Sequence, residues 1–398
     1  MRNLKPIITL SIALAASSSF AGQIAGKNVL LIQGYWPTHI FADPGDNGKV
    51  DGYRYWETSA LYNNGNGIEY HANGTINEQA DPNARILYYD SGRHLEESDP
   101  NKLGTGENVA NQLKAIFAAD PNYCADGCVL VTHSTGEIVM RYVMDANNAG
   151  LLGNYASNFK VDAVIEMAGA GGGTKLADIG VDLFEGINNV STFATDAFNA
   201  FFPGDITAPS TRIGMTVELQ PQVARDLANA ASLPAVPHFR IAGSGDEIFA
   251  PLTHAVIPGR DDSVLPLHST CGAALEGAYD SCVHDLAMDG RVKYVSNAPN
   301  SYYDYNYPII MSKNTPHNDM PQKINYWSYQ NLIFLPWYVK GHPMTFALSD
   351  ANRYKNTGNT PIDVDVSYHY EYPWFQKHRY ITNASKKSMS EVIMESFK

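Results

Sequence analysis

The sequence predicts an α/β fold, with a mostly parallel central sheet and helices on both of its faces. Short apolar runs typical of buried strands recur along the chain, and segments with helical spacing of apolar residues lie between them. Consecutive strand-helix-strand units of this kind form right-handed crossovers, and their ligands bind at the carboxyl ends of the strands. We therefore expect a functional site at that edge of the sheet.

The expected strands are five apolar runs, at residues 27–33 (KNVLLIQ), 85–89 (RILYY), 129–132 (VLVT), 161–167 (VDAVIEM) and 238–243 (HFRIAG). Residues 105–119 (TGENVANQLKAIFAA) carry apolar side chains on one face, which predicts an amphipathic helix. A second helix is expected directly after residue 134. Residues 43–83 are polar and rich in Gly and Asn, and we expect a surface excursion there.

The first 21 residues have the order of a secretory signal peptide. Arg2 and Lys5 precede an apolar stretch, and Ser19, Phe20 and Ala21 form a small-x-small cleavage site. The apolar stretch is shorter than the roughly 20 residues that a membrane-spanning helix needs. Cleavage after Ala21 would leave a mature chain that is secreted or periplasmic.

The net charge of the chain argues against some classes of binding partner. The chain has 28 basic and 41 acidic residues, a formal net charge of −13, which argues against nucleic acid or an anionic membrane surface as the main partner.

The four cysteines fall into two local pairs, Cys124 with Cys128 and Cys271 with Cys282. In an exported protein these pairs predict two disulfides, and a four-thiolate metal site lacks the usual Cys-x-x-Cys spacing.

Ser134 occupies the corner between a predicted strand and a predicted helix in VLVTHSTGEIVMRYV, residues 129–143. One interpretation is an ordinary turn, because Ser, Thr and Gly are common turn and cap residues. The other is a nucleophile elbow, which holds a serine hydroxyl above the end of a buried strand. A serine nucleophile needs a base within hydrogen-bond reach and a third group that orients the base.

Candidate acids and bases follow later in the chain. Asp262 begins a D-x-V-x-P turn and is the preferred acid; Asp246, in GSGDEIFAP, is the alternative. Asp side chains also cap turns without any catalytic role. His317 lies in the polar segment SKNTPHNDMPQ after both acids and is the preferred base, with His268 and His284 as alternatives.

The chain order Ser134, Asp262, His317, with GYW at residues 34–36 and THSTG at residues 132–136, resembles that of the α/β-hydrolase superfamily. Three further segments are similar to those of secreted bacterial triacylglycerol lipases: AGAGGGTKLAD (168–178), DDSVLPLHSTCG (261–272) and HND (317–319). The resemblance extends over residues 27–340.

This resemblance implies an α/β-hydrolase fold and assigns roles. Ser134 would be the nucleophile, His317 the general base and Asp262 the group that orients the imidazole, while the backbone N–H groups of Tyr35 and Thr135 would form the oxyanion hole. No cofactor is required. The resemblance also implies that Asp319 is a structural calcium ligand, and Asp246 could be a second. Two carboxylates do not define a calcium site, so we assign no metal here.

Three residues depart from the family pattern. Thr132 replaces the usual first Gly of G-x-S-x-G, Gln33 replaces the usual His before Gly34, and Glu137 follows Gly136 where a second Gly is common. A Cβ at residue 132 would crowd the tight strand-to-helix crossing. None of the three departures removes a reacting group.

A lid-like insertion is expected at about residues 174–235, as the resemblance implies. Residues 179–202 carry two apolar stripes, which predict either two helices packed permanently on the sheet or a mobile lid that contacts lipid and acyl chains. Trp36, Phe184 and Phe198 are the expected substrate-binding side chains.

The expected organisation is a catalytic domain at residues 22–340 and a strand-rich extension of unassigned role at 341–398. The expected function is a secreted serine hydrolase that cleaves carboxylic, lipid-like esters through an acyl-enzyme. An acyltransferase or polyester depolymerase would use the same triad, and an inactive binding protein of the same fold is the alternative outside enzymes.

Overall fold

The computed structural model describes residues 23–99, 101–186, 190–201, 212–231, 233, 236, 238–243, 250–259, 261–272, 292–294, 308–312, 315–322, 347–348, 366–371, 376–381 and 388–396. The expected signal peptide, with its cleavage site after Ala21, lies outside these residues.

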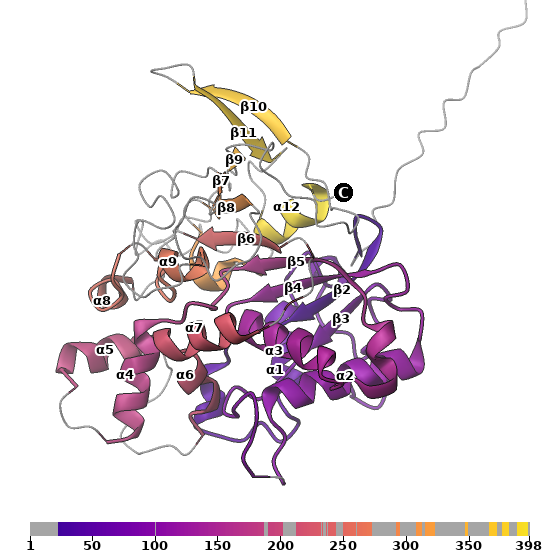
Figure 1. Ribbon diagram of the computed structural model, residues 1–398, viewed down its shortest axis with the longest axis horizontal. Coiled ribbons are helices and arrows are strands. Elements are labelled where there is room, and N and C mark those ends of the chain that lie inside the picture. The colour runs from indigo at the N-terminus through magenta and orange to yellow at the C-terminus, as the bar shows by residue number, and fades with distance from the viewer. Residues whose placement is uncertain are drawn as a thin grey trace, which may run out of the picture.

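An eight-stranded sheet forms the centre of the molecule (Figure 1). The strand order is β1-β2-β4-β5-β6-β8-β7, and β3 pairs with β2 on the edge opposite β4. Its strands are β1 (Gln23–Ile24), β2 (Lys27–Ile32), β3 (Ala84–Leu87), β4 (Cys128–His133), β5 (Val161–Met167), β6 (His238–Gly243), β7 (Val292–Tyr294) and β8 (Pro308–Ser312). The six strands from β2 to β6 and β8 pair in parallel, whereas β1 and β7 are antiparallel. The predicted mostly parallel sheet is therefore confirmed.

The five predicted strands coincide with β2 to β6. All six residues of β4 are buried, as expected for a central parallel strand that is covered on both faces. Such a strand has a nearly continuous apolar sequence, which explains why VLVT predicts it without any alternation.

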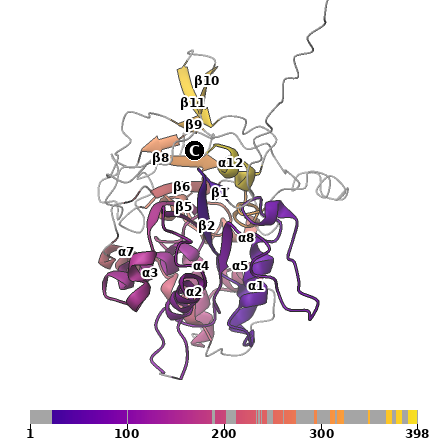
Figure 2. The same ribbon diagram turned by 90° about the vertical axis from the view of Figure 1, so that its right-hand side faces the viewer.

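Helices cover both faces of this sheet. Figure 2 shows α2 and α3 on one side of β2, with α1 and α12 on the other. The α-helices in the described ranges are α1 (Lys49–Trp56), α2 (Thr105–Ala119), α3 (Gly136–Asn148), α4 (Lys175–Phe184), α5 (Thr192–Phe201), α6 (Gly214–Glu218), α7 (Pro221–Ala230), α8 (Ala250–Thr253), α9 (Leu267–Thr270) and α12 (Met389–Ser396). The predicted helix at 105–119 coincides with α2.

The expectation of a surface excursion at residues 43–83 is wrong for part of that segment. It contains α1, whose Tyr53 and Trp56 side chains are buried in the core. The two aromatic residues lie three positions apart and so face the sheet together. Their polar neighbours hide this narrow apolar stripe in the sequence.

Helices α4 and α5 pack against each other through aromatic side chains. The Phe184 and Phe198 rings meet edge to face with their centroids 5.8 Å apart, and both side chains are buried. A Cβ at Gly180 would lie 2.5 Å from the Phe198 ring, so the two helices approach closely there. In this structure the two predicted apolar stripes meet as a packed helix pair.

The C-terminal part of the chain contributes a separate three-stranded antiparallel sheet of β9 (Ala347–Leu348), β10 (Val366–Glu371) and β11 (Gln376–Ile381), at the top of Figure 1. Beyond it, α12 returns to the main sheet. Ser390 of α12 accepts the Ala60 N–H at 3.1 Å and donates to the Gln322 carbonyl at 3.3 Å, which ties this helix to two distant loops.

Cys124 and Cys128 form the first predicted disulfide. Cys271 is buried, and its predicted partner Cys282 lies outside the described residues. Within the described ranges, no helix has both the length and the apolar character that crossing a membrane requires.

Replacing Phe198 with Ala tests whether the α4–α5 pair belongs to the core. Loss of this fully buried ring should cost about 3 to 5 kcal/mol of unfolding free energy. Phe193, on the same helix but 42% exposed, is the matched control, and its replacement with Ala should change stability by no more than about 0.5 kcal/mol. Denaturant unfolding of both variants measures this, and equal effects would show that the pair is not part of the cooperative core.

Candidate active site

Ser134 lies on a sharp turn between β4 and α3, with φ at +55°. Positive φ is uncommon for a residue with a Cβ and persists only where the surroundings impose it. Here the Ser134 N–H donates to the Met167 carbonyl at 3.1 Å, and its carbonyl accepts the Ala170 N–H at 3.1 Å. The end of β5 therefore holds the serine in the geometry of a nucleophile elbow.

Two glycines allow the backbone at the end of β2 to lie directly against this turn. A Cβ at Gly136 would come within 2.6 Å of the Gln33 carbonyl oxygen. A Cβ at Gly34 would come within 2.8 Å of the Ser134 Cβ. Neither position has room for a side chain. Glycine at both positions is therefore required for the turn at residues 132–136 to pack against residues 33–35.

The departures at 132 and 137 have different structural consequences. Glu137 is buried; one carboxylate oxygen accepts the Gly171 N–H at 2.7 Å and the other accepts Arg141 Nε at 3.0 Å. It therefore fastens α3 to the same post-β5 segment that holds Ser134. The Thr132 hydroxyl is buried and, in the described part of the chain, has no hydrogen-bond partner, which carries an energetic cost.

Asp262 and His317 form a buried pair at the ends of two further strands. Asp262 Oδ2 lies 2.8 Å from His317 Nδ1, and the His317 N–H donates to the Asp262 carbonyl at 3.1 Å. Asp262 Oδ1 accepts the N–H groups of Val264 and Leu265 at 3.1 and 2.8 Å. With Nδ1–H donating to the carboxylate, Nε2 of His317 is the nitrogen left to accept a proton.

His133 connects this pair to the elbow. Its Nε2–H donates to the His317 carbonyl at 3.0 Å, its Nδ1 accepts from the Tyr55 hydroxyl, and the two imidazole rings lie 4.6 Å apart. Burial, with a smaller contribution from charge on His317, lowers the pKa of His133 well below its ordinary value, so its ring stays neutral. Because His133 directly precedes Ser134, these contacts place His317 next to the elbow.

The side chains of Ser134 and His317 share no hydrogen bond in the described structure. In structures without substrate, the hydrogen bond between a nucleophile and its base is often long, and it tightens when substrate binds. The lack of a Ser134–His317 hydrogen bond therefore does not argue against a catalytic pair.

The alternative acid and bases are placed less favourably or lie outside the described residues. Asp246 and His284 are in the second group. His268 is buried on α9, where desolvation and the nearby Arg225 charge lower its pKa to about 4. A general base works best with a pKa near the operating pH, so His268 is poorly suited to that role at neutral pH.

Tyr35 and Thr135 approach the site from two adjacent strands. The Thr135 N–H lies at the start of α3 and donates to no acceptor within the described ranges. On the segment after β2, the N–H of Trp36, the residue after Tyr35, donates to Ser91 Oγ at 2.9 Å. The Tyr35 hydroxyl lies 2.6 Å from Thr216 Oγ1.

A mostly apolar cavity opens beside Ser134. It is lined by Tyr35, Ser134, Thr174, Leu176, Ala177, Thr216, Leu219, Val264 and Leu265. The expected substrate-binding residues do not line it: Phe184 and Phe198 pack on each other, and Trp36 packs near Tyr55 and His39. The beginning of α4 reaches the cavity, whereas its aromatic end points into the helix pair.

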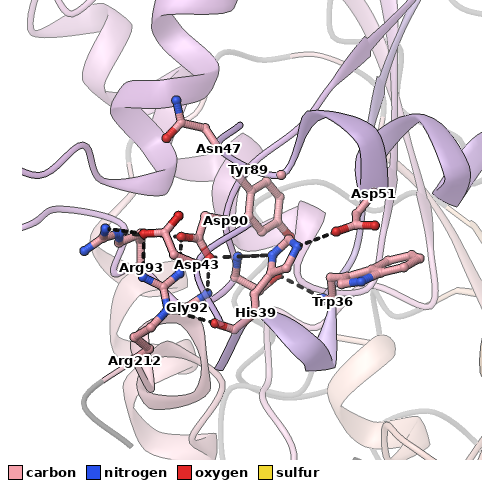
Figure 3. A network of polar contacts seen from close by, with 12 residues as sticks. Trp36, His39, Asp43, Asn47, Asp51, Tyr89, Asp90, Gly92, Arg93 and Arg212 are labelled. Carbon is pink, nitrogen blue, oxygen red and sulfur yellow. Dashed lines mark hydrogen bonds and ion pairs between the residues drawn. The ribbon is translucent and has the colours of Figure 1, made fainter. Parts of the chain in front are cut away.

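A polar network that the sequence did not predict supports the segment after β2 (Figure 3). His39 is buried within it; its Nε2–H donates to Asp51 at 3.0 Å, and its Nδ1 accepts the Ser91 N–H at 3.0 Å. This arrangement holds the turn that carries Tyr35 and Trp36.

Arg212 joins the segment that leads into α6 to this network. Its Nε donates to the His39 carbonyl at 3.0 Å, and its guanidinium pairs with Asp90 and, at 3.1 Å, with Asp43. Next to it, the Met215 N–H donates to the Ser91 carbonyl at 3.2 Å. The wall of the cavity formed by α6 is therefore fixed to the core. Nothing local in the sequence marks Arg212, because its partners lie far away along the chain.

No cluster of three or more metal-binding side chains occurs in the described ranges. Asp319 lies on the short 3₁₀ helix His317–Asp319, and the other expected calcium ligand, Asp246, lies outside these ranges.

Replacing Asp262 with Asn should slow the reaction of Ser134 with a fluorophosphonate by up to about 10⁴-fold, the loss found when a serine-protease triad aspartate becomes asparagine. An amide cannot hold the His317 tautomer or stabilise its charged form. Asp261→Asn is the matched control: this neighbouring carboxylate is also buried but bonds His254 and the Ser263 N–H, so the rate should stay within a few fold. Equal losses in both variants would contradict the role of Asp262.

His268 should make the protein sensitive to acid. Its pKa is about 4 in the folded chain and about 6.5 in the unfolded chain, so below pH 6.5 the unfolded state binds a proton that the folded state does not. The free energy of unfolding should fall between pH 6.5 and 4, with His268 contributing about 3 kcal/mol. His268→Gln should flatten this dependence in denaturant titrations, whereas His71→Gln, at an exposed site, should not. An unchanged slope in His268→Gln would refute the assignment.

No family model matches the chain, and no curated protein matches it. Among solved structures, it is similar to the Bacillus licheniformis lipase BlEst2, with 14% identity, 60% of this chain and 76% of that chain covered, and a TM-score of 0.33. Phospholipase PlaB from Legionella pneumophila matches with 16% identity and a TM-score of 0.30, and the match covers 56% of this chain and 41% of that chain. A thermophilic esterase from Thermogutta terrifontis matches with 12% identity, 58% and 78% coverage, and a TM-score of 0.27.

The assignment of the fold rests on topology. The turn with Ser134 follows β4, Asp262 comes after β6 and His317 comes after β8, and these three strands belong to the parallel part of one sheet. This order of a strand-turn-helix serine, an acid and a late histidine is that of the α/β-hydrolase fold.

Proposed function

We propose that this protein is a serine hydrolase that cleaves carboxylic esters through an acyl-enzyme. The observation that carries the proposal is the Asp262–His317 pair joined through His133 to a serine held at positive φ on a strand-to-helix turn. An ordinary turn would not need this strained serine, nor a buried carboxylate-imidazole pair beside it.

In the proposed mechanism, Nε2 of His317 takes the Ser134 hydroxyl proton as the oxygen attacks the ester carbonyl carbon. The carbonyl oxygen becomes an oxyanion that accepts hydrogen bonds from the backbone N–H groups of Tyr35 and Thr135. When the tetrahedral intermediate collapses, His317 returns the proton to the departing alcohol. A water molecule activated by the same imidazole then releases the carboxylic acid and restores Ser134.

Asp262 orients His317 and stabilises its charged form during both steps. The Asp262 carboxylate keeps its position through two backbone N–H groups, so it can hold the imidazole without moving. The proposed mechanism uses side chains and backbone groups of the chain and calls on no cofactor.

The lining of the cavity supports an acyl group as the part of the substrate that binds there. Most of its walls are aliphatic, from Leu176, Ala177, Leu219, Val264 and Leu265. This lining favours esters whose acyl group is apolar.

We also propose that the protein is exported, because residues 1–21 have the order of a signal peptide and the Cys124–Cys128 disulfide suits an oxidising compartment.

A fluorophosphonate probe on the purified mature protein tests the nucleophile. Wild type should be labelled on Ser134, and Ser134→Ala should lose both the label and the hydrolysis of a series of p-nitrophenyl esters from acetate to palmitate. Ser59→Ala, which removes a buried serine away from the elbow, is the control and should keep both. A folded wild type that takes no label, even with detergent present, would overturn the proposal in favour of a binding protein.

The same assay separates hydrolysis from acyl transfer. The proposal predicts equal molar amounts of released acid and alcohol even when a primary alcohol is added. Alcohol release in excess of acid, with a new ester formed, would show that the acyl-enzyme reacts mainly with an acceptor other than water.

A further inference from the structure

Tyr89 connects the two backbone segments that flank the candidate oxyanion hole. Its hydroxyl lies 3.0 Å from the Gln33 carbonyl, on the segment that leads to Tyr35, and 2.7 Å from Thr135 Oγ1, on the elbow. Tyr89 itself follows β3, next to β2 in the sheet. It therefore belongs to neither segment and contacts both.

The directions of these hydrogen bonds follow from the number of protons. The Gln33 carbonyl can only accept, so the Tyr89 hydroxyl donates its single proton to it. The Thr135 hydroxyl must then donate to the Tyr89 oxygen. Complete burial raises the pKa of Tyr89 far above its ordinary value, so the phenol stays protonated and keeps this arrangement at every working pH.

The surroundings hold Tyr89 firmly. Its side chain is fully buried, and its own carbonyl accepts Gln33 Nε2–H at 3.0 Å, so residues 33 and 89 are linked twice. The Gln33 carbonyl also lies against Gly136, where a Cβ would approach it to 2.6 Å. The elbow and the Gln33 segment are thus in contact, with the Tyr89 hydroxyl as a polar bridge between them.

We infer that the Tyr89 hydroxyl is a positioning group that sets the spacing between the two oxyanion donors, the N–H groups of Tyr35 and Thr135. The inference rests on the proposed function, because an oxyanion hole has a role only if Ser134 attacks a carbonyl. Gln33, which departs from the family pattern at that position, takes part through both its carbonyl and its side-chain amide.

A group that positions oxyanion donors acts on the transition state rather than on substrate binding. Donors of this kind work only when they lie 2.7 to 3.1 Å from the developing oxyanion, and loss of one donor lowers kcat by about 10² to 10³-fold. A displaced donor should cost part of that loss, while the substrate ester binds as before.

Tyr89→Phe removes only the bridging hydroxyl. We expect kcat for p-nitrophenyl esters to fall by about 10 to 100-fold with KM nearly unchanged. The inhibition constant of a trifluoromethyl ketone, which forms an oxyanion on Ser134, should rise by a similar factor. If the Tyr89 hydroxyl had only a structural role, Tyr89→Phe would lower the free energy of unfolding but leave kcat and the inhibition constant of the ketone unchanged.

Tyr123→Phe is the matched control. Tyr123 is also buried, and its hydroxyl lies 3.2 Å from the Val29 carbonyl and 2.8 Å from the Asn83 carbonyl, at the opposite end of β2 and β3. It loses the same kind of hydrogen bond and should lose comparable stability. Its kcat and its affinity for the ketone should match wild type.

Thr135 provides a second, independent variant of the same bridge. Thr135→Val removes the hydroxyl at constant shape and should reproduce the effect of Tyr89→Phe, whereas Thr135→Ser keeps the hydroxyl and should restore most of kcat. Because both variants break one bridge, the double variant Tyr89→Phe with Thr135→Val should be no slower than the worse single variant.

The outcomes separate this inference from the proposed function. An active wild type whose kcat and ketone affinity survive in Tyr89→Phe and Thr135→Val would overturn the positioning role alone. A wild type that is folded but neither hydrolyses esters nor reacts with the probe would overturn the proposed function, and this inference with it.

Discussion

The structure of the site depends on one constraint, the positive φ of Ser134. A serine keeps this conformation only where its neighbours supply more energy than the strain costs. Here the end of β5 supplies two backbone hydrogen bonds, and buried Glu137 fastens the same segment to the helix after the serine. The glycines at 34 and 136 are consequences of this turn, because any side chain there would collide with it.

Around this turn, buried neutral groups connect the ends of separate strands. His133 stays neutral because it is fully buried, and it can therefore donate one proton to the His317 carbonyl while it accepts another from Tyr55. Tyr89 connects the neighbouring pair of segments in the same way. Since each group is buried and satisfied, the backbone segments that it joins are held in place before a substrate arrives, and preorganisation of this kind is what electrostatic stabilisation of a transition state requires.

Much of the architecture is predictable from the sequence because it depends on local patterns. Five apolar runs predict β2 to β6, and the spacing in 105–119 predicts α2. Ser134, Asp262 and His317 are predictable as candidates from their chain order, and the structure brings the last two into contact. The network of His39, Asp43, Asp90 and Arg212 could not be predicted, because charge pairs between distant segments leave no periodic signal. The sequence did not predict the lining of the cavity for a related reason. An apolar stripe on a helix can contact either a substrate or a neighbouring helix, and the pattern does not distinguish the two. In the structure, Phe184 of α4 and Phe198 of α5 pack against each other.

We propose that the segments after β2, β4, β6 and β8 form one acyl-transfer site around Ser134. The most direct test is a crystal structure of the wild-type protein after reaction with an alkylphosphonate. We expect phosphorus bonded to Ser134 Oγ, one phosphonate oxygen about 3 Å from the backbone nitrogens of both Tyr35 and Thr135, and the alkyl group between Leu176 and Leu265. A phosphonate oxygen that faces solvent instead, or an adduct on another residue, would contradict the account.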